Sequence, residues 1–176
     1  MPSVDARRGD PGDRYVFLRQ DGEEQSFEVI SNEDGRIVTR TDDGCVWSRP
    51  VSAFGPNPDW KNCGGSSGQV TSAERLGGSI FPLAVGNTER WDYAVKSDTG
   101  AEWKGRRDCK VDAEVQITVP AGTFDTYHVR CEDKHWHWEW FVDGSGMTVQ
   151  FAKTVKVGHD GANGFGQLVS YVPASG

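Results

Sequence analysis

The chain lacks the patterns that identify several large classes of protein. Its 176 residues contain no run of the roughly 18 apolar residues that a membrane-crossing helix requires. They contain neither the G-x-S-x-G turn of many serine hydrolases nor the H-E-x-x-H motif of zinc proteases. No two cysteines have the C-x2-C spacing of a zinc site. We therefore expect no membrane-spanning helix, and no motif predicts an enzyme.

Positive charge is also scarce. The chain has 19 Lys and Arg residues against 26 Asp and Glu, which gives a formal net charge of −7. Nucleic-acid binding depends on a concentrated Lys/Arg surface, so this balance argues against a nucleic-acid partner. It equally disfavours binding to an anionic membrane surface. We interpret the acidity as a source of solubility.

Glycine, in contrast, is abundant, with 22 residues, many of them beside Asp or Asn. Such dipeptides are typical of tight turns between short strands. Helical periodicity is almost absent, so the predicted fold is all-β: an antiparallel meander that forms a strongly curved sheet or an incomplete barrel. Alternating polar and apolar residues predict strands at 14–20, 25–31, 36–41, 45–51, 89–96, 103–119, 123–132, 135–142, 147–157 and 165–172.

These strands predict a single β domain over residues 14–172. Residues 1–13 are expected to be a flexible N-terminus and residues 173–176 a short tail. Residues 53–78 are rich in Gly, Pro, Ser and Asn, and they predict a long loop or lid. A short helix at 72–76 is the one helical candidate.

The four cysteines indicate disulfides and therefore a compartment. Strand parity places Cys109 and Cys131 on the apolar faces of two adjacent strands, within one residue pair of each other. We predict a bridge between them, with a β-bulge adjusting the register, and a second bridge between Cys45 and Cys63. Two unlinked core cysteines are the alternative. Disulfides imply an oxidising compartment, so we expect an exported protein in the periplasm, on the cell surface or secreted.

The start of the chain is compatible with export but does not demand it. MPSVDARRGDPGDRY lacks the apolar core of a signal peptide. Either the protein is cytosolic, or this is a mature form from which a leader was removed. The cysteines favour the second interpretation.

The segment HWHWEW at 135–140 contains the candidate site. On an extended strand, His135, His137 and Glu139 share one face. Two histidines at i and i+2 can bind one divalent metal ion, and a carboxylate could complete an open site that activates water, as in carbonic anhydrases and cupins. The alternative is a solvated polar face on an outer strand, in which case no cofactor is expected.

The opposite face of the same segment carries Trp136, Trp138 and Trp140. Three indoles would bury a large area against the core. If they are exposed, a row of indoles could bind a ligand, for example by stacking on sugar rings, or hold a hydrophobic partner. A sheet needs one apolar face, which favours the core interpretation.

Three sequence blocks carry a resemblance to a known group. They are IFPLAVGN at 80–87, WDY at 91–93 and VPAGTFD at 119–125, followed by Cys131. Over about residues 80–171 the chain resembles uncharacterised exported bacterial proteins with a VPAGTF hairpin, often described as lipoproteins. The resemblance implies a strongly curved antiparallel sheet or incomplete barrel, similar to lipoprotein carriers, and it implies export. It supplies no catalytic residues.

Three functions remain open at this point. The first is a non-enzymatic exported β-domain of the cell envelope that binds a ligand or a protein partner. The second is a metal-binding protein or metal-dependent enzyme that uses His135, His137 and Glu139. The third is a structural module whose Trp-rich face contacts a neighbouring domain or subunit.

Overall fold

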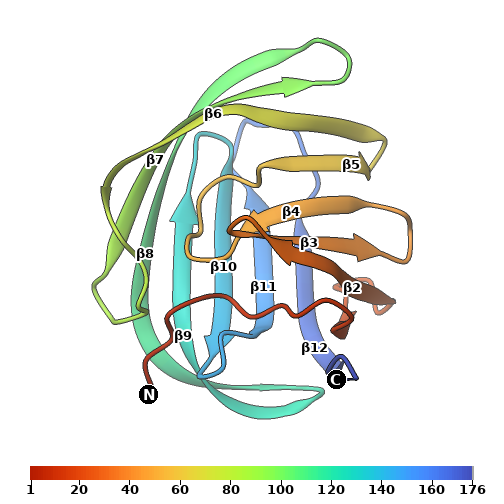
Figure 1. Cartoon of the computed structure of the whole chain (residues 1–176), viewed down its shortest axis with the longest axis vertical. Helices are drawn as coiled ribbons and strands as arrows, with labels where there is room; N and C mark the ends of the chain where they lie inside the picture. The colour runs from red at the N-terminus through yellow and green to blue at the C-terminus, as the bar shows by residue number, and fades with distance from the viewer. Residues whose placement is uncertain (176) are drawn as a thin grey trace.

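The computed structural model describes residues 1–175, and these residues form strands and connecting loops without a helix (Figure 1). The all-β prediction is confirmed. No helix of the described residues is long and apolar enough to cross a membrane. The strands are β1 (Arg14–Leu18), β2 (Glu24–Glu33), β3 (Arg36–Thr41), β4 (Val46–Pro50), β5 (Asp59–Cys63), β6 (Ser66–Gly78), β7 (Thr88–Ser97), β8 (Glu102–Val119), β9 (Gly122–Glu132), β10 (Trp136–Asp143), β11 (Thr148–Val155) and β12 (Gly164–Val172).

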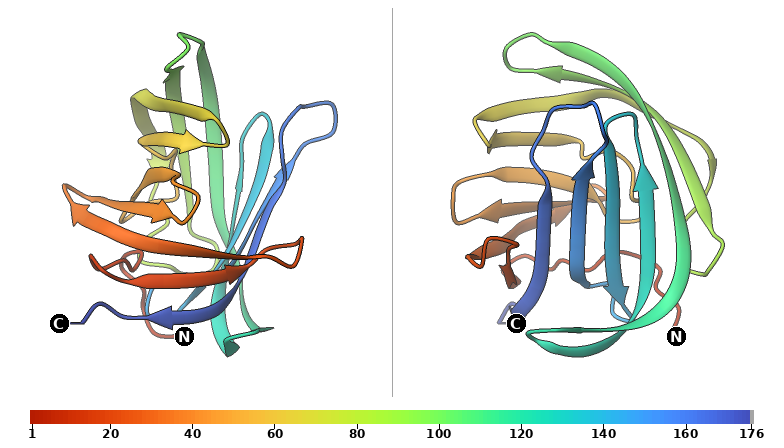
Figure 2. Two further views of the ribbon diagram at one scale, coloured as in Figure 1. Left: turned by 90° about the vertical axis from the view of Figure 1, so that its right-hand side faces the viewer. Right: turned by 180° about the vertical axis from the view of Figure 1, so that it is seen from behind.

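The strands form a closed barrel rather than an incomplete one. Each strand pairs antiparallel with its neighbours in the chain, and β1 pairs with β12 to close the circle. Figure 1 shows β2–β5 running across the front while β9–β12 run vertically behind them. Figure 2 shows that these two walls diverge towards the end at which the β7–β8 hairpin projects. The barrel is therefore flared at that end, which we call the flared end.

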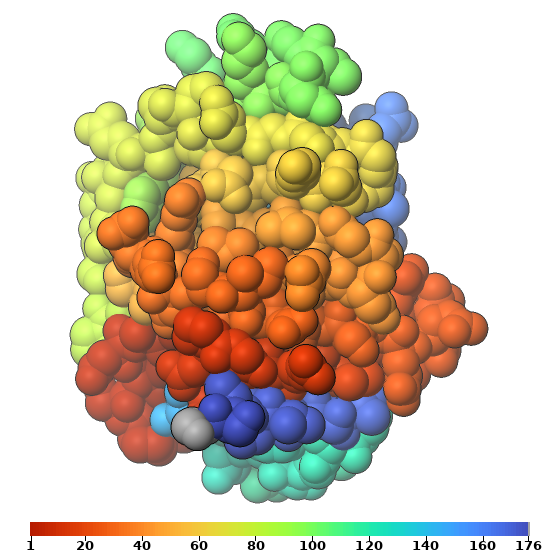
Figure 3. All heavy atoms as spheres, turned by 45° about the vertical axis from the view of Figure 1, so that its right-hand side comes forward, coloured from red at the N-terminus to blue at the C-terminus, as the bar shows by residue number. Residues whose placement is uncertain are grey.

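Asp13 supports the closure between β1 and β12. Its Oδ1 accepts hydrogen bonds from Tyr171 Oη at 3.2 Å and from the Ala174 amide at 3.0 Å. Its Oδ2 accepts from Tyr15 Oη at 3.1 Å. In Figure 3 the red N-terminal segment and the blue C-terminal strand accordingly lie side by side at the lower end of the molecule. Within the predicted tail, residues 173–175 have no regular structure, and Gly176 lies outside the described residues.

The segment predicted as a long loop contains two strands. Gly64 and Gly65 adopt φ values of 59° and 77°, which lets the chain turn tightly between β5 and β6. β6 then pairs with β7 along most of its 13 residues, so the helix expected at 72–76 is wrong. The prediction failed because β6 has few apolar residues, and its strand conformation depends on β7 rather than on local pattern.

The segment before β1 was expected to be flexible, but it packs against the lower part of the barrel. Val4 is buried, and its carbonyl accepts a hydrogen bond from the Leu83 amide at 2.8 Å. The Arg7 amide donates to the Val51 carbonyl, also at 2.8 Å. The Arg7 guanidinium lies over the Phe54 ring, 4.5 Å from its centroid. These contacts connect the segment to the core.

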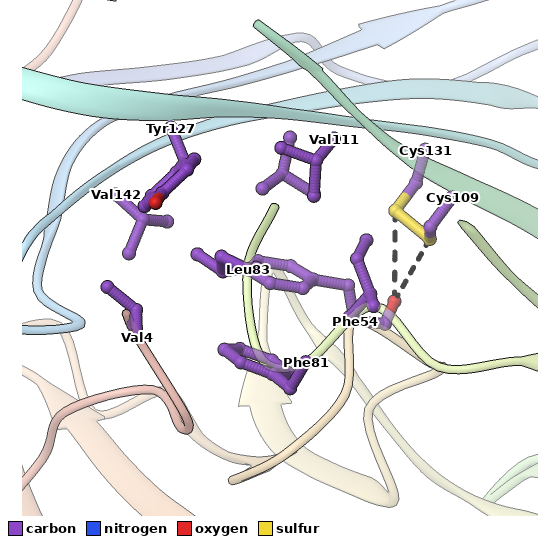
Figure 4. Close-up of a cluster of buried hydrophobic side chains, with 11 residues drawn as sticks. Val4, Phe54, Phe81, Leu83, Cys109, Val111, Tyr127, Cys131 and Val142 are labelled. Atoms are coloured by element: carbon purple, nitrogen blue, oxygen red, sulfur yellow. Dashed lines mark hydrogen bonds between the residues drawn. A yellow bond between two sulfur atoms is a disulfide. The ribbon is translucent and has the colours of Figure 1, made fainter. Parts of the chain in front are cut away.

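Two apolar clusters fill the barrel. The first surrounds the Cys109–Cys131 disulfide, and Figure 4 shows Phe54, Phe81 and Leu83 beneath it. The Phe54 carbonyl oxygen lies 3.6 Å from Cys109 Sγ and 3.9 Å from Cys131 Sγ. The second cluster is centred on Tyr15, Phe17, Val29, Ile37, Val149 and Leu168.

Both predicted disulfides are present. Cys109 lies directly opposite Cys131 in the β8–β9 ladder, and a register shift follows between Val111 and Ala113. Cys45 is bonded to Cys63 and joins the start of β4 to the end of β5.

Candidate functional site

The two faces of β10 are separated as strand geometry requires. Trp138 lies opposite Cys131 on β9 and Lys153 on β11, and Cys131 is fully buried. Trp136 and Trp140 share this inward side. His137 and Glu139 lie on the opposite face and point out of the barrel.

Each of the three residues predicted to bind metal contacts a different partner outside the predicted set. His137 Nδ1 lies 3.1 Å from Glu132 Oε1, and His128 Nε2 lies 3.2 Å from Glu139 Oε1. The His135 ring packs edge-on against the His159 ring, with centroids 4.4 Å apart. Within residues 1–175 no group of three His, Cys, Asp or Glu side chains is arranged to hold a metal ion. The structure therefore does not bring His135, His137 and Glu139 together.

The inward face of β10 carries a row of three indoles, which we call the indole ladder: Trp136, Trp138 and Trp140. Trp138 and Trp140 are parallel, with centroids 5.7 Å apart, and Trp136 lies 6.3 Å from Trp138. Trp138 and Trp140 pack against the first apolar cluster, as the core interpretation predicts. All three indoles are nevertheless only half-buried, because the ladder extends from the core towards the flared end.

Two cations lie on this ladder. The Lys153 ammonium is 3.7 Å from the Trp136 centroid and 4.9 Å from the Trp138 centroid. The Arg107 guanidinium is 5.2 Å from the Trp138 centroid. A cation over an indole face is attracted by the ring's negative potential, by about 0.5–2 kcal/mol depending on desolvation. The pKa of Lys153 is lowered, chiefly by burial and also by the positive charge of Arg107, although Asp133 acts in the opposite direction.

Arg107 is fixed by partners on three sides. Its guanidinium donates to the Gly55 carbonyl at 3.0 Å and pairs with Asp133 Oδ2 at 3.4 Å. Tyr93 Oη donates to the same Asp133 oxygen at 3.4 Å, and burial together with Asp133 raises the pKa of Tyr93. The other Asp133 oxygen accepts from the amides of His135 and Trp136, at 3.1 and 2.9 Å. Asp133 thus connects the β9–β10 turn to the buried cation.

Two donors at this position have no partner among the described residues. Arg107 Nε and Trp138 Nε1 are both buried, and neither has a hydrogen-bond acceptor among the described residues. A buried donor without an acceptor costs about 1–3 kcal/mol, and such groups in folded proteins normally meet water or a ligand. The two donors belong to residues that contact each other in the same cation–indole pair.

A surface groove lies beside this cluster and shares Asp133 with it. It has a volume of about 800 Å³ and is lined by β6, β7, β8 and the β9–β10 turn. Tyr93, Gly105 and Asp133 form part of its wall. Tyr93 and Asp133 contact Arg107, so these two residues lie between the groove and the cation. We define Trp136, Trp138, Lys153, Arg107 and Asp133 as the cation–indole site.

Sequence reasoning found the indoles but missed the two cations. On β11, Lys153 occupies a position on the same face as the apolar residues Val149, Phe151 and Val155. On β8, Arg107 lies on the same face as Cys109 and Val111. A charged residue at an inward parity position is the signal that could have identified them.

Comparison with known proteins supports the fold. No family model and no curated protein matches the chain. The structure is similar to that of the hypothetical lipoprotein YmcC from Escherichia coli (K12), with a TM-score of 0.56 at 11% identity over 93% of this chain and 86% of that chain. A Bacteroides fragilis protein described as exported, with a YmcC-like fold, gives a TM-score of 0.41 at 9% identity over 97% and 100% of the two chains. A Parabacteroides distasonis protein described as a lipoprotein gives 0.43 at 10% identity over 96% and 99%.

Proposed function

We propose that this protein is a non-enzymatic β-barrel of the cell envelope that binds a small ligand at the cation–indole site. The observation that carries the proposal is the coincidence of two unpartnered buried donors, Arg107 Nε and Trp138 Nε1, at one cation–indole contact. A bound ligand with acceptor groups would supply the hydrogen bonds that these donors lack.

Binding is favoured over catalysis because the oxygens of the acidic residue of the site already accept hydrogen bonds. Asp133 is the carboxylate of the site, and it already accepts from two turn amides, Tyr93 and Arg107. It therefore has little remaining capacity to act as a base. The inward orientation of the indoles also favours a ligand over a neighbouring subunit, since a protein partner would need an exposed Trp face.

Export is supported by the two disulfides, which are rare in the reducing cytosol. It is also supported by the fold similarity to YmcC, which is described as a lipoprotein. Together these observations favour a location outside the cytoplasm.

Ligand-observed NMR against a library of neutral, anionic and cationic fragments tests the proposal. Trp136→Leu removes an indole from the site, and His137→Ala is the matched control, because it changes the next residue on the opposite face. We expect fragments that compete for one site, lose binding in Trp136→Leu and keep it in His137→Ala. Circular dichroism would verify that each variant folds, and Lys153→Met replaces Trp136→Leu if the latter does not. An absence of fragment binding, or binding equal in the folded site variant, would refute the proposal.

A further inference from the structure

We propose that the ligand of the cation–indole site is a hydroxylated anion whose carboxylate or phosphate group lies between Lys153 and Arg107. The inference rests on the function proposed above and adds the chemical class of the ligand. Its starting point is a local charge that opposes the charge of the whole protein.

The site has an excess of positive charge. The chain carries a net charge of −7, yet Lys153 forms no ion pair with any acidic side chain of residues 1–175 and is influenced by Asp133 only at longer range. Arg107 has Asp133 as its ion-pair partner, at 3.4 Å. Two cations against one carboxylate leave one positive charge without a counterion. A partly buried cation without a partner is costly, so an anion that entered the site would be strongly favoured.

The two cations lie near each other, since both contact one indole and Arg107 acts electrostatically on Lys153. Lys153 and Arg107 both contact the Trp138 ring, with the ammonium 4.9 Å and the guanidinium Cζ 5.2 Å from its centroid. An oxyanion between them could accept from the Lys153 ammonium and from the free Arg107 Nε. Lys and Arg provide the usual donors for carboxylate and phosphate groups, and both kinds of hydrogen bond are strengthened by charge.

The polar character of the site favours a hydroxylated body over an acyl chain. An acyl chain would leave Trp138 Nε1 buried without an acceptor, at a cost of about 1–3 kcal/mol. Hydroxyl groups can accept from that indole. Half-buried indoles are also flat surfaces on which a sugar ring can lie. These features together describe an acidic sugar or sugar phosphate better than a lipid anion.

NMR titration with matched probes tests this inference. The probes are glucose, glucuronate and glucose 6-phosphate, which share a hydroxylated ring and differ in charge, together with dodecanoate and dodecyl phosphate as lipid-like anions. We expect binding of glucuronate, glucose 6-phosphate or both, weakened by added salt because the contact is ionic. Lys153→Gln should weaken it about tenfold, which is typical of one lost charged hydrogen bond. Lys153→Arg should retain it, and Lys96→Gln, at an exposed lysine, is the matched control.

The outcomes separate the two proposals. Equal binding of glucose at the same site would overturn the anionic class and leave the proposed ligand site intact. Binding of the alkyl anions without the sugar anions would overturn the hydroxylated body. If Lys153→Gln binds the sugar anions as well as the unchanged protein does, the assigned position is refuted. Failure of every probe to bind would overturn the inference about the ligand class. The fragment screen would still decide whether the ligand site exists.

Discussion

Replacing Asp133 by Asn should destabilise the barrel by about 3 kcal/mol. The change removes the negative charge that faces Arg107, whose side chain is 9% exposed, while that of Asp133 is 4% exposed. Removing one partner of a buried ion pair leaves an uncompensated charge and typically costs about 3–5 kcal/mol. Asn retains an oxygen that can accept from the amides of His135 and Trp136, so the turn itself should persist. We therefore expect the lower end of that range.

A second substitution separates the charge effect from a simple loss of packing. In the double variant Asp133→Asn/Arg107→Met no buried charge is left alone, so its stability should be no lower than that of either single variant. The coupling energy between the two positions should be about 2 kcal/mol or more. An exposed pair provides the control: Arg106 Nε lies 2.8 Å from Asp92 Oδ1, and Asp92→Asn should leave the stability nearly unchanged because solvent screens the pair.

Urea unfolding of the oxidised protein, followed by circular dichroism, measures these differences. For a protein of this length, about 3 kcal/mol corresponds to a fall in Tm of roughly 6–12 °C. A loss below about 1 kcal/mol in Asp133→Asn would refute the argument. So would additive losses in the double variant, because the pair would then not be energetically coupled.

Three further predictions use the same measurement. Cys109→Ala/Cys131→Ala should lose about 3 kcal/mol, because that bridge closes a loop with a sequence separation of 22 residues; an unchanged urea midpoint would contradict it. Val4→Ser should lose about 1–2 kcal/mol of stability because Val4 is buried, whereas Val85→Ser, at an exposed valine, should have little effect. Equal losses of stability in the two variants would mean that the N-terminal segment is mobile. Burial raises the pKa of Glu89, so ionisation of this carboxyl opposes folding, and the stability of the protein should fall as the pH rises through the range just above 4.5. Glu89→Gln should flatten this part of the plot of stability against pH. Parallel plots for the variant and the unchanged protein would disprove the assignment.

The local β structure was largely predictable because it is encoded in short-range signals. Asp34 and Gly35 adopt φ values of 52° and 73°, as a tight hairpin turn requires, and the Asp-Gly dipeptide predicts such a turn. The cysteine hairpin followed from parity, since Cys109 and Cys131 fall on one face whatever the remainder of the fold is. Both features depend on residues close to one another along the chain.

The missed features depend on residues far apart in sequence. β6 is a strand because it pairs with β7, and its own composition resembles a loop. Closure of the barrel depends on β1 pairing with β12 at the other end of the chain, beside the contacts of Asp13 with Tyr171 and Ala174, and no local pattern indicates it. Val4 is buried because it reaches Leu83.

The position of the cation–indole site follows from the unequal lengths of β8 and β9. β9 ends at Glu132, opposite Asp108, whereas β8 begins at Glu102, so the β8 residues before Asp108 pair with β7 alone. The chain leaves β9 at this level, and the turn that follows directs Asp133 against Arg107. A charge at an inward position is tolerated where polar partners are available to it. The early end of β9 supplies such a partner in Asp133, which explains why the barrel can hold Arg107 here.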